Sequence, residues 1–421
     1  MRNSGKPEKK VDPMQKAISA RKSLLAVLLA CALAIGWVPQ AAYADDSGAE
    51  SPDRAFAATS SGLAVASQTK AVRTIMLYDC GSNLETESGM ASYNLRQVLR
   101  TRFSADDDVR FVVMTGGSKA WHLEQSYLYD PATGTNPATI SAEYNQIWEA
   151  KGLDAPANAG QMVLCDGDGV SGDGDAAKKS KDELMSDPAT LKAFINYAAE
   201  NFPAQKYDLI LWDHGGGPVS GFASDQHGPQ GQYMAFAGIL DALSDNAVIR
   251  SGEKFDFVDF DACVMGGVEL TLAIADYADY YIASPETEPG YGQDYEGWLN
   301  SVGADPGKDA YEVGKQIVDD FVAFYDKESG DGASQEGTLA VVDERKLLES
   351  DFVPALAELD HMLEESAKSP WSDGEYHYYD VLSSIRGRCS TATWATTTSA
   401  TSRARPRSPC TTWNRARRSA T

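Results

Sequence analysis

The stretch LILWDHGGG (Leu209–Gly217) decides the fold class, because it is an apolar run that ends in a histidine followed by glycines. A second stretch of the same kind, FVDFDACVMGG, ends in Cys263, forty-nine residues after His214. Short apolar runs bounded by glycine are typical of strands that are buried on both faces. The carboxyl ends of parallel strands meet at one edge of a sheet, so these two strands would bring an imidazole and a thiol together.

Strand and helix patterns alternate on both sides of these stretches. Further strands are predicted at Val72–Cys80, Asp108–Gly117, Tyr280–Glu286 and Gly337–Asp343, with an edge hairpin at WHLEQSYLYD (Trp121–Asp130). Helices are predicted at Ser88–Phe103, Asp187–Phe202, Ala235–Val248, Val264–Tyr277, Asp309–Lys327 and Glu344–Ser366. The helix predicted at Asp187–Phe202 follows a loop, with Asp187 as its cap and Pro188 as its first helical residue. The alternation predicts an α/β fold with a mainly parallel central sheet and helices on both faces.

The charge of the chain excludes one broad class of partner. The net charge is −24 over 421 residues, and hydrophobic residues make up 43%, which is ordinary for a globular protein. Residues 45–384 hold 22 basic and 59 acidic side chains, so their net charge is −37. A body this acidic does not bind nucleic acid through bulk electrostatics, whereas it attracts cationic partners such as basic peptides.

The N-terminus has the pattern of an export signal. A basic leader precedes the apolar run SLLAVLLACALAIGWV (Ser23–Val38), and AAYADD then offers an A-x-A site with cleavage after Ala44. Residues 1–44 are therefore predicted to be a signal peptide and residues 45–70 a flexible spacer. Two alternatives stay open, an uncleaved anchor and lipoprotein processing at Cys31. The expected location is secreted or attached to the cell surface, without a stable membrane span in the mature chain.

The C-terminal segment differs from the rest of the chain. Residues 385–421 hold eight arginines, no acidic residue, no lysine and no apolar periodicity. Two interpretations remain open, a disordered basic low-complexity tail and translation out of frame.

The histidine and the cysteine suggest acyl transfer. A thiol with an ordinary pKa of about 8.5 is only slightly ionised at neutral pH, and a nearby imidazole can take its proton. Gly215 has no side chain, so its N–H can approach a substrate carbonyl, and with the N–H of Cys263 it forms a candidate oxyanion hole. A helix predicted to begin directly after Cys263 would also favour the thiolate.

These blocks resemble the two signature blocks of the clostripain family of cysteine endopeptidases, which are related to caspases, gingipains and legumains. IMLYDCGSNLETESGMAS, VRFVVMTGG, DPATLKAFINYAAENFPAQKYDLILW and IASPETEPGYGQDYEGWL also resemble segments of that family, in the same order. The resemblance covers roughly residues 70–370 and implies a caspase/gingipain-like three-layer sandwich. It implies a peptidase domain at residues 71–384, truncated at its C-terminal end, with His214 as the catalytic histidine and Cys263 as the nucleophile.

The resemblance also implies specificity for arginine, and sometimes lysine, on the amino side of the cleaved bond. Asp261 matches an acidic residue of the family's S1 pocket, and Asp294 is a second candidate for that pocket; a carboxylate can bind a guanidinium in two charge-assisted bonds. The expected partners are therefore peptides and proteins with Arg or Lys at P1. Family members mature by self-cleavage, for which this chain offers Arg250 or AAKKSK (Ala176–Lys181).

Other patterns lead to weaker hypotheses. The chemistry needs no cofactor, but Asp166, Asp168, Asp173 and Asp175 lie among glycines and are candidate Ca²⁺ ligands, the alternative being a solvated acidic loop. The spacing does not fit an EF-hand. HGGG also occurs in lipases, but no G-x-S-x-G nucleophile motif is present. A catalytically inactive secreted binding or adhesion protein on the same scaffold remains the alternative function.

Overall fold

The computed structural model describes residues 70–105, 107–136, 139–153, 160–167, 183–230, 232–328 and 337–368. The predicted signal peptide, the spacer up to residue 69 and the tail at 385–421 lie outside these ranges. Among the described residues, those up to Ala357 belong to one compact unit and those from Glu358 to a second. No helix within the described ranges is both long enough and apolar enough to cross a bilayer.

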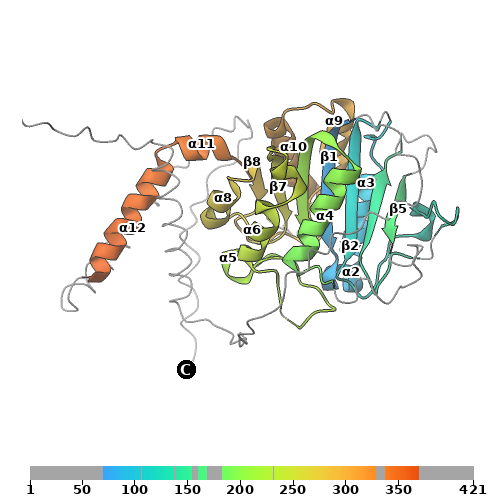
Figure 1. Cartoon of the computed structure of the whole chain (residues 1–421), viewed down its shortest axis with the longest axis horizontal. Coiled ribbons are helices and arrows are strands. Elements are labelled where there is room, and N and C mark those ends of the chain that lie inside the picture. The colour runs from blue at the N-terminus through green and yellow to red at the C-terminus, as the bar shows by residue number, and fades with distance from the viewer. Residues whose placement is uncertain are drawn as a thin grey trace, which may run out of the picture. The chain divides into compact units, whose positions relative to one another are not determined.

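Nine strands of the described residues form one sheet, in the order β3-β5-β4-β2-β1-β6-β7-β8-β9 (Figure 1). Their bounds are β1 (Ala71–Cys80), β2 (Val109–Gly116), β3 (Leu128–Tyr129), β4 (Gln146–Lys151), β5 (Gln161–Gly167), β6 (Ala204–Trp212), β7 (Phe255–Asp261), β8 (Ala278–Ala283) and β9 (Ala340–Asp343). The five central strands, β2, β1, β6, β7 and β8, are parallel to one another. Strands β4 and β9 run antiparallel at their pairings with β2 and β8.

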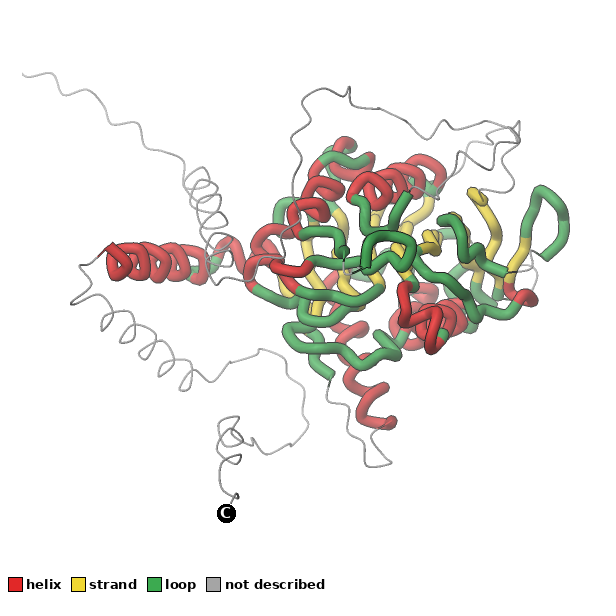
Figure 2. Tube along the Cα trace, turned by 90° about the horizontal axis from the view of Figure 1, so that it is seen from below, coloured by secondary structure: helices red, strands yellow, loops and turns green. Residues whose placement is uncertain are grey.

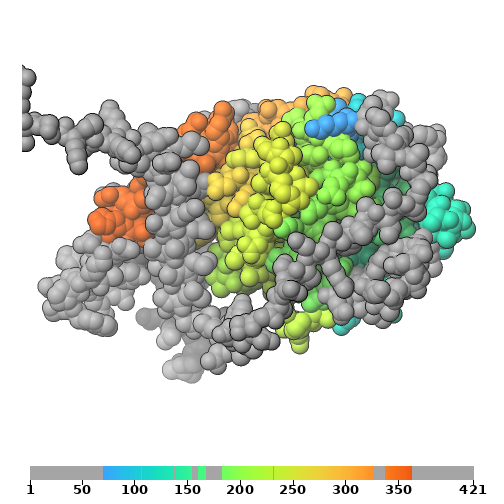
Figure 3. Space-filling model, viewed as in Figure 1, coloured from blue at the N-terminus to red at the C-terminus, as the bar shows by residue number. Residues whose placement is uncertain are grey.

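Helices cover both faces of the sheet (Figure 2). Their bounds are α2 (Ser82–Ser88), α3 (Met90–Leu99), α4 (Pro188–Asn201), α5 (Gly217–Ser220), α6 (Phe236–Ser244), α7 (Ala247–Arg250), α8 (Val268–Ile274), α9 (Tyr295–Ala304), α10 (Ala310–Glu328), α11 (Glu344–Glu349) and α12 (Phe352–Lys368), with a 3-10 turn η1 (Gln125–Tyr127). One core contains side chains of α4, α6 and α8. The outer sides of these helices form the green-to-yellow surface in Figure 3. The other contains side chains of α3, α9 and α10.

Alternate residues of the central strands enter the two cores, as the period of two of a strand requires. In β6, Leu209 and Leu211 pack in the first core, whereas Ile210 and Trp212 pack in the second. Because both sets are apolar, this strand reads as a continuous hydrophobic run rather than an alternating one. The predicted α/β three-layer sandwich with a mainly parallel sheet is therefore confirmed.

The order of the strands reverses between β1 and β6. From β1 the chain crosses over α3 to β2 on one side, and from β6 it crosses over α6 to β7 on the other side. Right-handed crossovers in opposite directions place their helices on opposite faces, which explains why α3 and α6 lie in different cores. The carboxyl ends of β1 and β6 thus form a topological switch point, where α/β proteins bind their ligands.

Several predicted boundaries are wrong, and glycine or a polar cap explains most of them. The helix predicted at Ser88–Phe103 is two helices, α2 and α3, separated by Gly89 with φ +66°. The helix predicted at Ala235–Val248 ends at Ser244, and Asn246 caps the separate helix α7. Strands β4 and β5 were missed, and the predicted hairpin at Trp121–Asp130 is the turn η1 and the short strand β3. The predicted cap of α4 is confirmed, since Asp187 accepts a bond of 2.9 Å from Ala189 N.

Candidate active site

His214 and Cys263 lie at the same level on neighbouring strands. Strands β6 and β7 are parallel, and their last aligned pair is Trp212 with Asp261. His214 and Cys263 each follow two residues beyond that pair. The predicted juxtaposition of imidazole and thiol at one edge of the sheet therefore agrees with the register of the two strands, beside the switch point.

Gly215 allows the two segments to approach. A Cβ at this position would overlap the carbonyl oxygen of Cys263 and would lie 2.9 Å from Cγ of Met265 and 3.2 Å from Cβ of Ala262. The glycine after the histidine is thus required by a close approach of backbone to backbone. The oxyanion hole of Gly215 and Cys263 stays a prediction.

The backbone around Cys263 differs from the predicted strand-to-helix junction. Val264 has φ +53°, a conformation that β-branched residues rarely adopt, and its N–H donates to the Glu286 carbonyl at 2.7 Å. Helix α8 begins only at Val268. The predicted start of a helix directly after Cys263 is therefore wrong, because four residues separate the cysteine from α8.

A different donor lies at the sulfur. The backbone N–H of Glu288 is 3.3 Å from Sγ of Cys263, and the thiol lies 3.7 Å from the Glu288 carbonyl oxygen. The loop after β8 thus contacts the sulfur of Cys263 through the backbone of Glu288.

The imidazole of His214 is half-buried and has one side-chain partner within the described residues. Its Nε2 lies 3.0 Å from Oδ1 of Asn83, at the start of α2. Burial lowers the pKa of His214, and the nearby charge of Glu87 opposes that effect. The histidine is therefore suited to be a neutral base near pH 7.

Asp261 is buried among neutral donors and lies beside a second acid, Glu288. Its carboxylate accepts from the N–H of Gln293 at 3.1 and 3.2 Å and from the hydroxyl of Tyr295 at 3.0 Å. Burial raises its pKa to about 6, and these donors oppose the rise. None of the described residues forms an ion pair with Asp261.

Glu288 is the second acid, and sequence reasoning missed it. Burial and the charge of Asp261 raise the pKa of Glu288 well above its usual range. Neither carboxyl oxygen of Glu288 receives an N–H or a separate hydroxyl from the described residues. Two buried acids without a counterion form a site that fits a cation. The only sequence signal was an acid in the glycine- and proline-rich stretch SPETEPGYG.

Gly292 brings the loop directly over this acid pair. A Cβ at Gly292 would lie 2.8 Å from Oδ1 of Asp261, and the residue has φ +65°. The hydroxyl of Tyr325 donates to the Gly292 carbonyl at 2.8 Å, and Nδ2 of Asn94 donates to the Tyr291 carbonyl at 3.1 Å. Helices α10 and α3 therefore hold the loop that lies against Asp261.

Asp294, the other S1 candidate, has different contacts. It caps α9, where its carboxylate accepts from Glu296 N at 3.1 Å, and it also accepts from Nε2 of Gln97 at 3.2 Å. It lines a surface pocket with Tyr93, Arg96 and Arg100 of α3. These contacts assign it the role of a helix cap beside the loop.

The remaining predicted residues lie elsewhere. Asp166 lies on β5, whereas Asp168, Asp173 and Asp175 and the segment AAKKSK are outside the described residues. No group of three or more acids, histidines and cysteines within the described ranges could hold a metal ion. Cys80 and Cys165 are free thiols. Arg250 ends α7 before β7 begins, at the edge of the sheet opposite Cys263, so this cysteine cannot reach it within one molecule.

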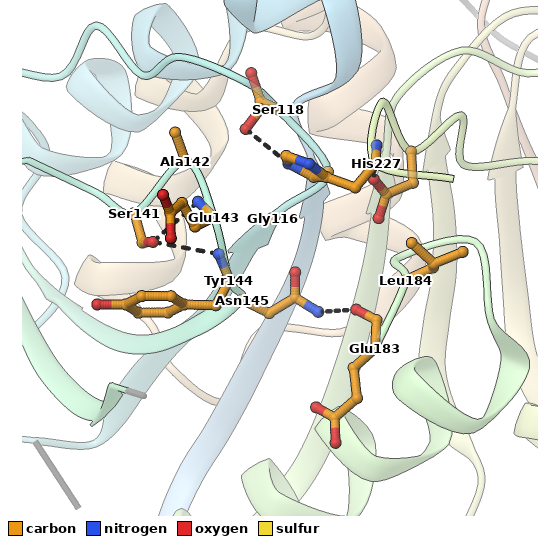
Figure 4. A pocket seen from close by; sticks show the side chains of 12 residues that line it. Gly116, Ser118, Ser141, Ala142, Glu143, Tyr144, Asn145, Glu183, Leu184 and His227 are labelled. Carbon is orange, nitrogen blue, oxygen red and sulfur yellow. Dashed lines mark hydrogen bonds between the residues drawn. The ribbon is translucent and has the colours of Figure 1, made fainter. Parts of the chain in front are cut away.

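A further pocket lies at the carboxyl end of β2 (Figure 4). His227 occupies it, with Nε2 3.3 Å from the Ser118 carbonyl, and Asn145 donates to the Glu183 carbonyl across it. Neither His214 nor Cys263 lines this pocket. The candidate active site is therefore separate from it.

Comparisons with known proteins point to one family. The model of the clostripain family matches residues 80–400. Clostripain of Hathewaya histolytica is 32% identical over 94 residues, which are 20% of this chain and 18% of that protein. The alignment thus spans less than a fifth of the length of that relative.

Two solved structures resemble the chain at lower identity. One is a secreted C11 cysteine protease from Bacteroides thetaiotaomicron in complex with an irreversible peptide inhibitor, with 18% identity, 72% of each chain covered and a TM-score of 0.48. The other is an inactive zymogen C11 protease from Parabacteroides distasonis, with 21% identity, 72% of this chain and 69% of that chain covered and a TM-score of 0.46.

Proposed function

Because the chain belongs to the clostripain family of cysteine peptidases, we propose that it is a secreted endopeptidase that cleaves peptide bonds after arginine. The observation that carries the proposal is the register of β6 and β7, with His214 and Cys263 each two residues beyond the pair Trp212–Asp261. Lysine at P1 is the secondary substrate, since its ammonium is a point charge and forms no bidentate pair.

The chemistry follows from the residues at the edge of the sheet. His214 takes the proton from the thiol of Cys263, and the sulfur attacks the carbonyl carbon of the substrate. The N–H groups of Gly215 and Cys263 bind the oxyanion of the tetrahedral intermediate. The imidazolium then gives its proton to the leaving amine, which leaves a thioester on Cys263. Water, deprotonated by His214, hydrolyses the thioester and restores the thiol.

The acid pair supports selection of arginine. A guanidinium bound beside Asp261 and Glu288 would supply the positive charge that these two buried acids lack among the described residues. A neutral P1 side chain would leave both buried carboxyl groups without a counterion. Recognition of P1 therefore rests on Asp261 together with Glu288, rather than on Asp294.

Export through residues 1–44 completes the proposal. The basic leader, the apolar run and the A-x-A site support it. Amino-terminal sequencing of the protein recovered from the culture medium should begin at Asp45. A chain that starts at Met1 and stays with the membrane fraction would contradict export.

The test of the whole proposal is hydrolysis of fluorogenic peptides with Arg, Lys, Asp or Leu at P1, by the wild type and by Cys263→Ala. Cys165→Ala is the matched control, because this thiol lies on β5, which three strands separate from β6, and it donates to the Val163 carbonyl at 3.4 Å. We expect cleavage after arginine that is absent in Cys263→Ala and retained in Cys165→Ala. Equal cleavage by Cys263→Ala would contradict the mechanism, and no cleavage by any form would favour the inactive binding protein.

A further inference from the structure

The hydrogen bond between Asn83 and His214 connects the two strands at the switch point. Asn83 is the second residue of α2, directly after β1, and His214 follows β6, which pairs with β1. The distance from Oδ1 of Asn83 to Nε2 of His214 is 3.0 Å.

An amide oxygen only accepts hydrogen bonds, so this contact determines which ring nitrogen carries the proton. With Oδ1 of Asn83 at Nε2, the neutral imidazole has its N–H on Nε2. The other nitrogen, Nδ1, then has a free lone pair and is the atom that can take a proton from a thiol.

The segment that carries Asn83 is held firmly. Ser82 is fully buried with φ +47°, a strained left-handed conformation. Glu85, one turn further along α2, accepts from Ser92 N at 2.8 Å and from His122 N at 2.6 Å. Thr86 Oγ1 lies 2.6 Å from Oε1 of Gln226. Strain that the surroundings maintain at one residue is typical of segments that position a functional group.

The charges near His214 explain why a neutral amide suits this position. Glu87 of α2 already acts on the imidazole, and the carboxylate of Asp213 is turned away to the N–H of Ser224 and to Ser82. A carboxylate at position 83 would add a negative charge in contact with the ring and favour the imidazolium. An amide orients the ring without that effect.

We propose that Asn83 is a positioning residue for His214, which keeps the N–H on Nε2 and holds Nδ1 towards the thiol of Cys263. The inference rests on the proposed cysteine peptidase function. The proton that His214 takes from Sγ goes to Nδ1 and then to the leaving amine, while the Nε2–H bond to Asn83 stays intact throughout the cycle.

The kinetic test compares Asn83→Ala and Asn83→Asp with the wild type over a range of pH, with a peptide that has arginine at P1. Asn83→Ala should lower kcat by about tenfold to a hundredfold, the usual effect of removing a group that orients a reacting side chain, with KM within twofold. Asn83→Asp should retain part of kcat, and the acid limb of its kcat–pH profile should shift upwards by about one pH unit. Asn201→Ala, an exposed residue of α4, is the matched control and should behave like the wild type.

A second readout does not depend on activity. In the Cys263→Ala background, the nitrogen chemical shifts of His214 should show the Nε2–H tautomer with Asn83 and a mixture of tautomers with Asn83→Ala. Unchanged spectra of His122 and His227 would show that the fold is intact. A wild-type tautomer in Asn83→Ala would overturn the inference even if kcat falls, and so would a kcat within twofold of the wild type.

The two proposals fail in different ways. If the wild type does not cleave, or if Cys263→Ala cleaves, the proposed function is wrong, and the tautomer still reports whether Asn83 orients the ring. If the wild type cleaves and Cys263→Ala does not, while Asn83→Ala matches the wild type, only the positioning role is wrong.

Discussion

Replacing Gly215 with alanine tests how closely the histidine and cysteine segments must approach. The new Cβ would overlap the Cys263 carbonyl oxygen and lie 2.9 Å from Cγ of Met265. The methionine side chain can rotate away, but a backbone carbonyl cannot move without its chain. The substitution must therefore displace one of the two segments.

The cysteine segment has little freedom to yield. The N–H of Val264 donates to the Glu286 carbonyl at 2.7 Å, and the N–H of Gly266 donates to the Ser284 carbonyl at 2.6 Å. The displacement therefore falls on His214 and on residue 215 itself. We expect a loss of about 1–3 kcal/mol in the free energy of unfolding, as for other overpacking substitutions. Loss of one oxyanion donor should lower kcat by about a hundredfold to a thousandfold.

The assay is kcat and KM for a peptide with arginine at P1, together with thermal unfolding. Gly307→Ala is the matched control, because the nearest atom to its Cβ would be Oδ1 of Asp305 at 3.7 Å, an ordinary contact. We expect that control to keep both the activity and the Tm of the wild type. A Gly215→Ala protein with wild-type kcat and Tm would refute the close approach of the two segments and the oxyanion role together.

Four further predictions concern charge and metal. Asp261→Asn should lower kcat/KM for arginine peptides by about tenfold to a hundredfold, since a charge-assisted bond contributes about 1.5–3 kcal/mol; equal values in variant and wild type would remove Asp261 from the S1 pocket. Because the pKa of Asp261 is about 6, kcat/KM for arginine should fall as the pH drops through 6, and a flat profile from pH 8 to 5 would contradict this. Burial also raises the pKa of Asp213 to about 7, so its contribution to stability is present below pH about 4 and is lost as the pH rises through 7. Scanning calorimetry should therefore show a larger loss of Tm between pH 5.5 and 8 in the wild type than in Asp213→Asn. If residues 166–175 bind Ca²⁺, calcium should raise Tm in the wild type and not in the double variant Asp168→Asn/Asp173→Asn, whereas equal shifts would place any calcium elsewhere.

Sequence reasoning placed the candidate residues at one edge of the sheet, because strand ends carry a strong local signal. His214 and Cys263 both follow uninterrupted apolar runs and precede glycine, and parallel strands place such ends at one edge. Helix boundaries were less accurate, because they depend on single residues. Gly89 with φ +66° divides one predicted helix, and the conformation of Val264 delays α8 by several residues.

The amino-acid sequence by itself determined the α/β class, the pairing of His214 with Cys263 and the candidacy of Asp261, because each depends on local periodicity and on the order of elements along the chain. Only the tertiary structure revealed that Asn83 lies at the imidazole of His214. Only the tertiary structure likewise showed Glu288 beside both the thiol of Cys263 and the carboxyl group of Asp261. Asn83 is 131 residues from His214, and Glu288 is 25 residues from Cys263. Contacts over such separations depend on strand order and loop path, which no local pattern encodes.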